Sequence, residues 1–192
     1  MASLSGLHLR GWLQKRLLMP RLRLIRLVVC DVDGVLTDGG LQYDEDGRVL
    51  KRFDVRDGLA VRMLQRSGIV VALLSGGRSG AIEQRARHLD IQYCRVGVED
   101  KQAGLEQLRS ELGMAQDQTA FIGDDLNDLV VRPVTGILTA TADADPFLRL
   151  QADFVLSKRG GEGAVREFCE ALLSSRGLLT SIQRTGWRDI NA

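Results

Sequence analysis

The chain contains little of what defines several common protein classes. Only 5% of its 192 residues are aromatic, three are cysteines, and the formal net charge is +1. The cysteines are odd in number, far apart and without metal-ligand spacing, so we expect reduced thiols in a cytoplasmic protein and no disulfide framework. No apolar run approaches the roughly 20 residues of a membrane span. Basic residues interleaved with aromatic ones are absent, which argues against nucleic-acid binding.

The chain also has no internal repeat, low-complexity tract or linker that would divide it. A hydrophobic content of 44% supports a single core. Residues 1–23 form a basic leader, predicted to be a helix packed on the body or on a neighbouring subunit, or a disordered segment. A membrane-surface or targeting role is the alternative. We place one domain over residues 24–178, with a hairpin insertion at about 40–53, and a C-terminal tail over residues 179–192.

Apolar runs and amphipathic segments alternate along most of the chain. This alternation predicts βαβ units and an α/β, Rossmann-like fold with a parallel sheet flanked by helices. Ligands in such folds bind beyond the carboxyl ends of the strands. The predicted strands are residues 26–30, 69–74, 93–96, 119–122, 135–139 and 153–156. The predicted helices are residues 57–67, 79–89, 101–112, 126–132, 145–151 and 162–174.

The most informative motif is Asp31-Val32-Asp33-Gly34, which follows the apolar run Leu27-Val28-Val29. Two carboxylates at the end of a buried strand repel each other and lose solvation. They are reasonable where a divalent cation lies between them, or where one is a nucleophile and the other a proton donor. The ordinary alternative is a turn rich in Asp and Gly.

Three further polar groups follow predicted strands, and each alone has an ordinary explanation. The segment Ser75–Arg78 offers a hydroxyl and backbone N–H groups that suit a phosphate, or it is a plain βα loop. Lys101 begins a helix, where a cation is unfavourable unless it serves an anion, or it is a surface charge. Asp124, Asp125 and Asp128 form an acidic cluster, although acids also cap helices.

Taken together, in chain order, the four groups resemble the haloacid dehalogenase superfamily of phosphotransferases, from about residue 27 to residue 173. The resemblance implies that Asp31 is the nucleophile and Asp33 the general acid/base, while Ser75 and Lys101 hold the phosphoryl group. It also implies a Mg²⁺ cofactor. The implied metal ligands are Asp31, Asp33 and Asp124, with Asp125 and Asp128 as support.

A predicted hairpin narrows the resemblance from the superfamily to one family within it. Asp46-Gly47 predicts a tight turn between two strand-like arms, and no insertion is long enough for a separate cap domain. With the segments Phe53–Gly58 and Gly160–Glu167, the chain is similar to the 3-deoxy-D-manno-octulosonate 8-phosphate phosphatase family, which serves lipopolysaccharide synthesis. That resemblance implies a homotetramer whose hairpins assemble the subunits and whose neighbours cover each other's sites. An isolated ribbon is marginal in water, so a partner subunit is its natural support.

The chain departs from the family pattern at three positions. Ser75 stands for a threonine, Gly77 for a long cation and Glu162 for an arginine. Loss of a cation matters at a site for an anionic sugar acid, because an Arg fork suits a carboxylate and Glu repels it. The remaining candidates for substrate contacts are Gly76, Arg78, Arg56, Lys158 and Arg159.

We therefore predict a Mg²⁺-dependent phosphatase that hydrolyses the phosphate monoester of a keto-sugar acid through an aspartyl-phosphate. One alternative is a phosphatase for a nine-carbon keto-sugar acid phosphate or another small sugar phosphate. The alternative of another class is a non-catalytic module that uses the fold to bind or oligomerise. Such a module is expected to have lost Asp31 or Asp33, and both are present.

Overall fold

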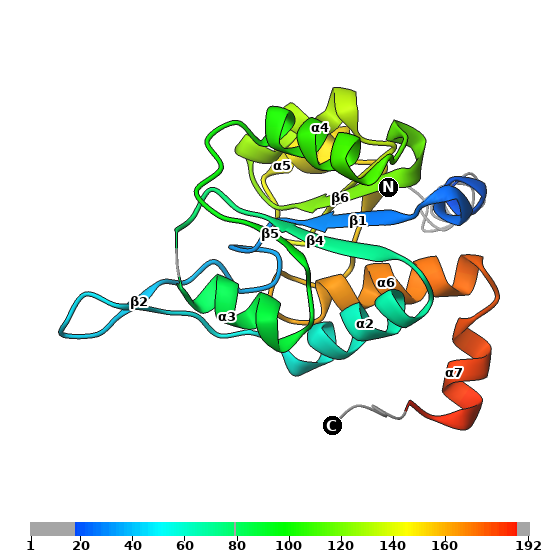
Figure 1. The fold of residues 1–192 in the computed structure, drawn as a ribbon, viewed down its shortest axis with the longest axis horizontal. Coiled ribbons are helices and arrows are strands. Elements are labelled where there is room, and N and C mark those ends of the chain that lie inside the picture. Colours follow the sequence, from blue (N-terminus) through cyan, green and yellow to red (C-terminus); the bar gives the residue numbers. More distant parts are fainter. Residues whose placement is uncertain (1–17, 79, 188–192) are drawn as a thin grey trace, which may run out of the picture.

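A computed structural model describes residues 18–78 and 80–187, and it confirms the α/β architecture (Figure 1). Six parallel strands form one sheet in the order β5-β4-β1-β6-β7-β8. The strands are β1 (Leu27–Cys30), β4 (Val70–Leu74), β5 (Tyr93–Arg95), β6 (Thr119–Gly123), β7 (Ile137–Ala140) and β8 (Phe154–Val155). The helices are α2 (Val55–Arg66), α3 (Gly80–His88), α4 (Lys101–Leu112), α5 (Pro146–Gln151), α6 (Ala164–Ser175) and α7 (Leu179–Thr185), with 3₁₀ helices η1 (Gln116–Gln118) and η2 (Leu126–Val134).

Helices cover both faces of the sheet (Figure 1), as the continuous apolar strands require. The helices α2, α3 and α6 lie on one face and α4, η2 and α5 on the other. Each face has its own core: Phe168 of α6 is buried in the first, and Leu105 and Leu108 of α4 are buried in the second. β1 lies between β4 and β6, and all four of its residues are buried. The central position of β1 places the residue that follows it in the middle of the carboxyl edge.

The structure differs from several predicted elements; for example, the strand predicted at 135–139 is β7 (Ile137–Ala140) and the helix predicted at 162–174 is α6 (Ala164–Ser175). The segment predicted as a helix at 126–132 is the 3₁₀ helix η2, which contains Pro133. The predicted C-terminal tail contains α7. α2 starts at Val55, two residues before the predicted position 57, because the Asp54 side chain accepts a hydrogen bond from the amide of Arg56 (2.7 Å) and caps the helix there.

The end of the basic leader is part of the fold. Residues 18–24 are helical, and Leu18 and Leu22 are buried in the core on the α2–α6 face. The rest of the leader lies outside the described residues. No helix within residues 18–78 and 80–187 is long and apolar enough to cross a membrane.

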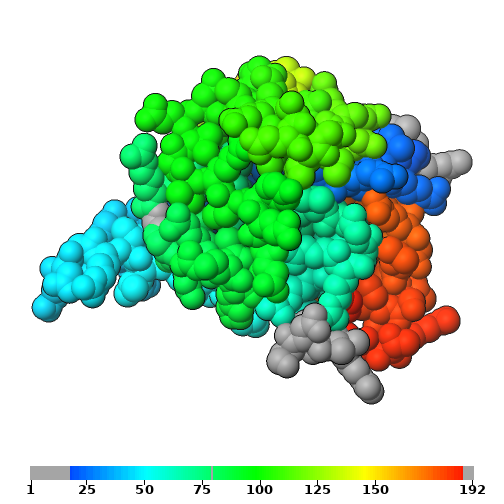
Figure 2. All heavy atoms as spheres, viewed as in Figure 1, coloured from blue at the N-terminus to red at the C-terminus, as the bar shows by residue number. Residues whose placement is uncertain are grey.

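The predicted hairpin is a ribbon over residues 41–52 that extends away from the body (Figure 2). Its strands β2 (Gln42–Tyr43) and β3 (Val49–Leu50) pair antiparallel around a turn in which Gly47 has φ +75°. A Cβ on Gly47 would meet nothing within 4 Å. Leu41, Tyr43 and Leu50 are 50%, 65% and 54% exposed. We call this segment, residues 41–52, the ribbon.

Candidate active site

Asp31, the first residue after β1, is still hydrogen-bonded to the neighbouring strand of the sheet. The Asp31 amide donates to the carbonyl of Ile122 on β6 (2.9 Å), and Asp31 is 5% exposed. The chain then turns at Gly34, which has φ +80°. A Cβ on Gly34 would overlap the carboxylate of Asp124, so only glycine allows these two loops to approach. The close approach places the acids that follow β1 and β6 beside each other.

A buried lysine joins two of these acids. Asp100 caps α4 through the amide of Ala103 (3.0 Å) and so fixes Lys101 as the first residue of the helix. The Lys101 Nζ lies 2.8 Å from Asp31 Oδ2 and 2.6 Å from Asp128 Oδ1. Burial alone would lower the pKa of Lys101, but the charges of Asp128 and Asp31 more than offset burial and raise this pKa. Lys101 is therefore a charged, buried lysine.

Asp31, Asp124 and Asp128 each place a carboxylate oxygen within 4.8 Å of the others. Burial, with the charges of Asp128 and Asp31, raises the pKa of Asp124 to about 8. Burial and the charge of Asp128 likewise raise the pKa of Asp31 to about 6, although Lys101 acts in the opposite direction. One lysine thus leaves the three acids with uncompensated negative charge. An all-oxygen donor set with excess negative charge fits Mg²⁺, which prefers few carboxylates together with waters.

Asp128 also organises the backbone around this trio of acids. Its second oxygen accepts hydrogen bonds from the amides of Asp124 (2.9 Å) and Asp125 (3.3 Å). These bonds hold the turn between β6 and η2, and Asp128 itself is fully buried. The Asp125 side chain is instead exposed and caps η2 through the amide of Leu126 (2.7 Å).

Asp33, which was also predicted as a metal ligand, does not belong to the cluster of Asp31, Asp124 and Asp128. The Asp33 carboxylate pairs with Lys51 of the ribbon, whose side chain is 2% exposed, whereas that of Asp33 is 31% exposed. Sequence reasoning missed Lys51, because a lysine in a hairpin arm has no local signal that connects it to a distant carboxylate. The contact ties the base of the ribbon to the site.

Ser75 lies buried at the end of β4. Its hydroxyl accepts a hydrogen bond from the Gly77 amide (3.1 Å), as in a Ser/Thr turn. A Cβ on Gly77 would lie 2.9 Å from Asp33 Oδ2 and 3.4 Å from Ser75 Oγ. A side chain at position 77 would therefore crowd the Asp33 carboxylate in this conformation.

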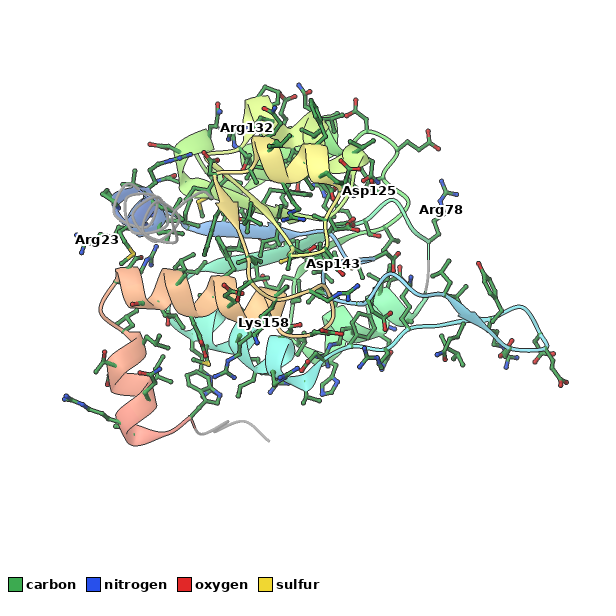
Figure 3. All side chains as sticks on the ribbon, turned by 180° about the vertical axis from the view of Figure 1, so that it is seen from behind. Arg23, Arg78, Asp125, Arg132, Asp143 and Lys158 are labelled. Carbon is green, nitrogen blue, oxygen red and sulfur yellow. The ribbon has the colours of Figure 1, made fainter. Side chains whose placement is uncertain are left out.

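These groups surround one cleft of about 310 Å³ at the carboxyl edge of the sheet. Figure 3 shows Asp125 and Arg78 near this end and Arg23 at the opposite end. Seven of the lining residues were predicted as site residues and Gly77 was named as a departure from the family pattern, whereas Gly39 and Asn127 were missed. Asn127 lies between Asp125 and Asp128 in the sequence but carries no charge to mark it. The lining residues are Asp31, Asp33, Gly39, Ser75, Gly76, Gly77, Lys101, Asp124, Asp125 and Asn127.

The four predicted basic contacts do not line this cleft. Arg56 is held by Asp54 through Nη2 (2.5 Å) and Nε (3.0 and 3.1 Å). Arg159 pairs with Asp143 (3.2 Å) and is 66% exposed. Arg78 and Lys158 are exposed (Figure 3). A single copy of the chain therefore brings together the groups expected to act on the phosphate, but of those expected to contact the rest of the substrate only Gly76 lines the cleft.

Comparisons with known proteins agree with this geometry. Two family models described as haloacid dehalogenase-like hydrolase match residues 42–130 and 96–168. A 3-deoxy-D-manno-octulosonate 8-phosphate phosphatase of Haemophilus influenzae is 41% identical over 160 residues, which are 83% of this chain and 89% of that protein.

Solved structures show the same fold. The phosphatase of that name from Moraxella catarrhalis, in complex with magnesium, phosphate and KDO, is 34% identical with a TM-score of 0.87. The match covers 90% of this chain and 99% of the Moraxella catarrhalis chain. The cobalt-bound phosphatase from Haemophilus influenzae is 41% identical with a TM-score of 0.81, covering 83% and 94% of the two chains.

Proposed function

Because the chain belongs to the haloacid dehalogenase-like hydrolases and, within them, to the 3-deoxy-D-manno-octulosonate 8-phosphate phosphatase family, we propose that it hydrolyses the phosphate ester of that eight-carbon keto-sugar acid. It is a phosphatase, and its cofactor is Mg²⁺. The observation that supports the reaction best is the buried contact of Lys101 with Asp31 beside Asp124 and Asp128. On the same family grounds, we propose a cytoplasmic enzyme whose product serves lipopolysaccharide synthesis.

Asp31 and Asp33 divide the chemistry between them. Asp31 attacks phosphorus, its carboxylate oxygen forms a bond to phosphorus, and the bond to the sugar oxygen breaks, which leaves an aspartyl-phosphate. Asp33 gives its proton to the departing sugar oxygen and then takes one from the water that hydrolyses the aspartyl-phosphate. The partly exposed Asp33 carboxylate suits this role, because both the leaving group and the water must reach it.

Lys101 and Ser75 position the phosphoryl group. Both are buried and line the cleft beside Asp31. The Lys101 ammonium neutralises charge on the phosphoryl oxygens, and the Ser75 hydroxyl and neighbouring backbone N–H groups donate hydrogen bonds to them. Asp31 and Asp124 are the proposed metal ligands, with Asp128 as a further ligand or as support. When bound there, Mg²⁺ supplies positive charge that stabilises the transferring phosphate.

The first test of this function is phosphate release from a panel of sugar phosphates, measured with Mg²⁺ and with EDTA. The panel includes the eight-carbon and nine-carbon keto-sugar acid phosphates and simple hexose phosphates. We expect release that requires Mg²⁺, is lost in EDTA and returns when Mg²⁺ is restored, with the eight-carbon acid preferred. Preference for the nine-carbon acid, or equal rates on simple sugar phosphates, would reject the proposed substrate. Absence of phosphate release from every member would support the non-catalytic alternative.

We also propose that the protein is a homotetramer assembled through the ribbon. The exposed side chains of Leu41, Tyr43 and Leu50 give the ribbon an apolar surface that one copy does not cover. A neighbouring subunit would bury that surface and could bring basic groups such as Arg56 to the cleft.

Replacing these three ribbon side chains by serine is expected to dissociate the assembly, because it removes the apolar surface but leaves Lys51 and the turn intact. Light scattering should then report the mass of a smaller species. The matched control is Arg48→Ser, which changes a 75% exposed side chain of the same ribbon and should leave the mass unchanged. A triple variant with the mass of the unmodified protein would contradict assembly through the ribbon.

A further inference from the structure

A glycine turn lies directly behind the loop that carries Asp31 and Asp33. A Cβ on Gly160 would overlap the carbonyl oxygen of Gly34, and one on Gly161 would lie 2.6 Å from the amide nitrogen of Asp38. The Gly161 amide donates to the carbonyl of Val35 (3.0 Å). The two backbones therefore touch without intervening side chains. We call residues 160–163 the glycine turn and residues 31–38 the catalytic loop.

Two carboxylates hold the backbone of the glycine turn and of the first turn of the helix that follows it. On one side, Asp143 accepts from the Gly160 amide (3.0 Å) and from Arg159 Nε (3.2 Å). On the other, Asp57 of α2 accepts from the amide of Arg166 (2.7 Å) in the first turn of α6. The N-cap residue of α6 is Gly163, which has no side chain to do this and has φ +97°. Asp57 therefore caps, from another helix, the helix that the glycine turn begins.

Asp57 is an unusual choice for a purely structural role. It is fully buried, and burial is the main reason that its pKa is raised to about 6. Asp57 is not among the residues that line the cleft. A buried carboxylate costs free energy, and the hydrogen bond that this one accepts lies in the first turn of α6, where it holds the start of that helix.

The contacts continue from the glycine turn to the metal-binding acids. Gly34 lies between the glycine turn and the Asp124 carboxylate, because a Cβ on Gly160 would overlap the Gly34 carbonyl oxygen and a Cβ on Gly34 would overlap the Asp124 carboxylate. A shift of Gly160 would consequently move Gly34. That would change the spacing between Asp33 and Asp124, which follow different strands.

We infer that Asp57 is a positioning residue: through the first turn of α6 and the glycine turn, it fixes the catalytic loop against Asp124. Asp143 holds the other side of the turn in the same way. The expected effect of Asp57 on catalysis rests on the proposed phosphatase function, whereas its effect on the position of the catalytic loop does not. Misplacing reacting groups by about 1 Å can cost on the order of 100-fold in rate, so a modest shift of this loop is sufficient.

The test compares Asp57→Ala with Asp57→Asn, which keeps an acceptor oxygen for the Arg166 amide. The control is Asp153→Ala, which removes an acceptor from the amide of Leu138 (2.9 Å) and breaks ion pairs at the opposite end of the strands. The readouts are melting temperature, phosphate release below the melting range, and hydrogen exchange of peptides that cover the catalytic loop.

We expect Asp57→Ala to lower kcat by about 10-fold or more with a smaller change in KM, and to raise exchange in the catalytic loop. In Asp57→Asn, both kcat and the exchange of the catalytic loop should be close to those of the unmodified protein. Asp153→Ala should lower the melting temperature but leave kcat and catalytic-loop exchange unchanged. If Asp57→Ala does not fold, Asp143→Ala, at a partly exposed position, replaces it with the same expectations.

Unchanged catalytic-loop exchange in Asp57→Ala, or an equal loss of kcat in Asp153→Ala, would overturn the inference. Changed exchange in a protein whose unmodified form releases no phosphate from the panel would reject the proposed function and leave the positioning role supported. The two failures are thus distinguishable.

Discussion

The Asp31→Asn variant is expected to lose turnover by about 10⁴-fold or more, because an amide cannot form the aspartyl-phosphate. The fold should survive. Asparagine has nearly the same shape, and the Asp31 carboxylate is already disfavoured in its ionised form, as its raised pKa shows. Removing one of three crowded acids also reduces their repulsion. Phosphate release and a melting curve, measured on the same preparation, check both expectations.

The matched control for this variant is Asp38→Asn. Asp38 is the exposed acid of the same loop and pairs with Arg52 (3.0 Å). Surface pairs of this kind contribute little, so phosphate release should stay within a few-fold of that of the unmodified protein. Activity in Asp31→Asn comparable to that of Asp38→Asn would remove Asp31 from the nucleophile role.

Replacing Lys101 with methionine should cost about 100- to 1,000-fold in kcat, for two reasons that act together. The phosphoryl oxygens lose a buried positive charge, and Asp31 loses the partner that lowers its pKa. Without that partner, the pKa of Asp31 rises above about 6, so a larger share of the nucleophile is protonated near neutral pH. The acidic limb of the activity profile should therefore move to higher pH.

A pH–rate profile of Lys101→Met separates this account from simple loss of stability. The control is Arg149→Met, which removes one positive charge from an exposed position of α5 and should leave the profile in place. A Lys101→Met enzyme with lower kcat but an unmoved acidic limb would show that Lys101 does not set the ionisation of Asp31.

The four central strands, β1, β4, β6 and β7, could be predicted from the sequence because they are buried and appear as largely apolar runs. The predicted strands at 26–30 and 69–74 correspond to β1 and β4 within one residue at each end. The helix predicted at 101–112 is α4 with the same bounds. The 3₁₀ character of η2 was not predictable in this way, since it depends on Pro133 and on contacts made by Asp128 after folding.

The candidate site was predictable where its chemistry lies at the end of a strand. Three of the site residues, Asp31, Ser75 and Asp124, directly follow the last residue of a strand. The parallel sheet brings the carboxyl ends of those strands together. Lys101 was suggested by its unfavourable place at a helix start. Lys51 and Asp57 carried no such signal, because their roles depend on contacts between segments far apart in the chain.

Two glycines with almost the same backbone φ angle differ in the substitutions that they tolerate. Gly47 turns the ribbon at φ +75° with open space around it, so asparagine or aspartate could replace it at small cost. Gly34 has φ +80°, but any side chain there would overlap the Asp124 carboxylate. Shortening residue 124 would relieve that overlap only by removing a carboxylate that we propose as a metal ligand. Positions 34 and 124 are therefore locked as a pair, and divergence of this protein toward other substrates has to proceed through residues at the margin of the cleft.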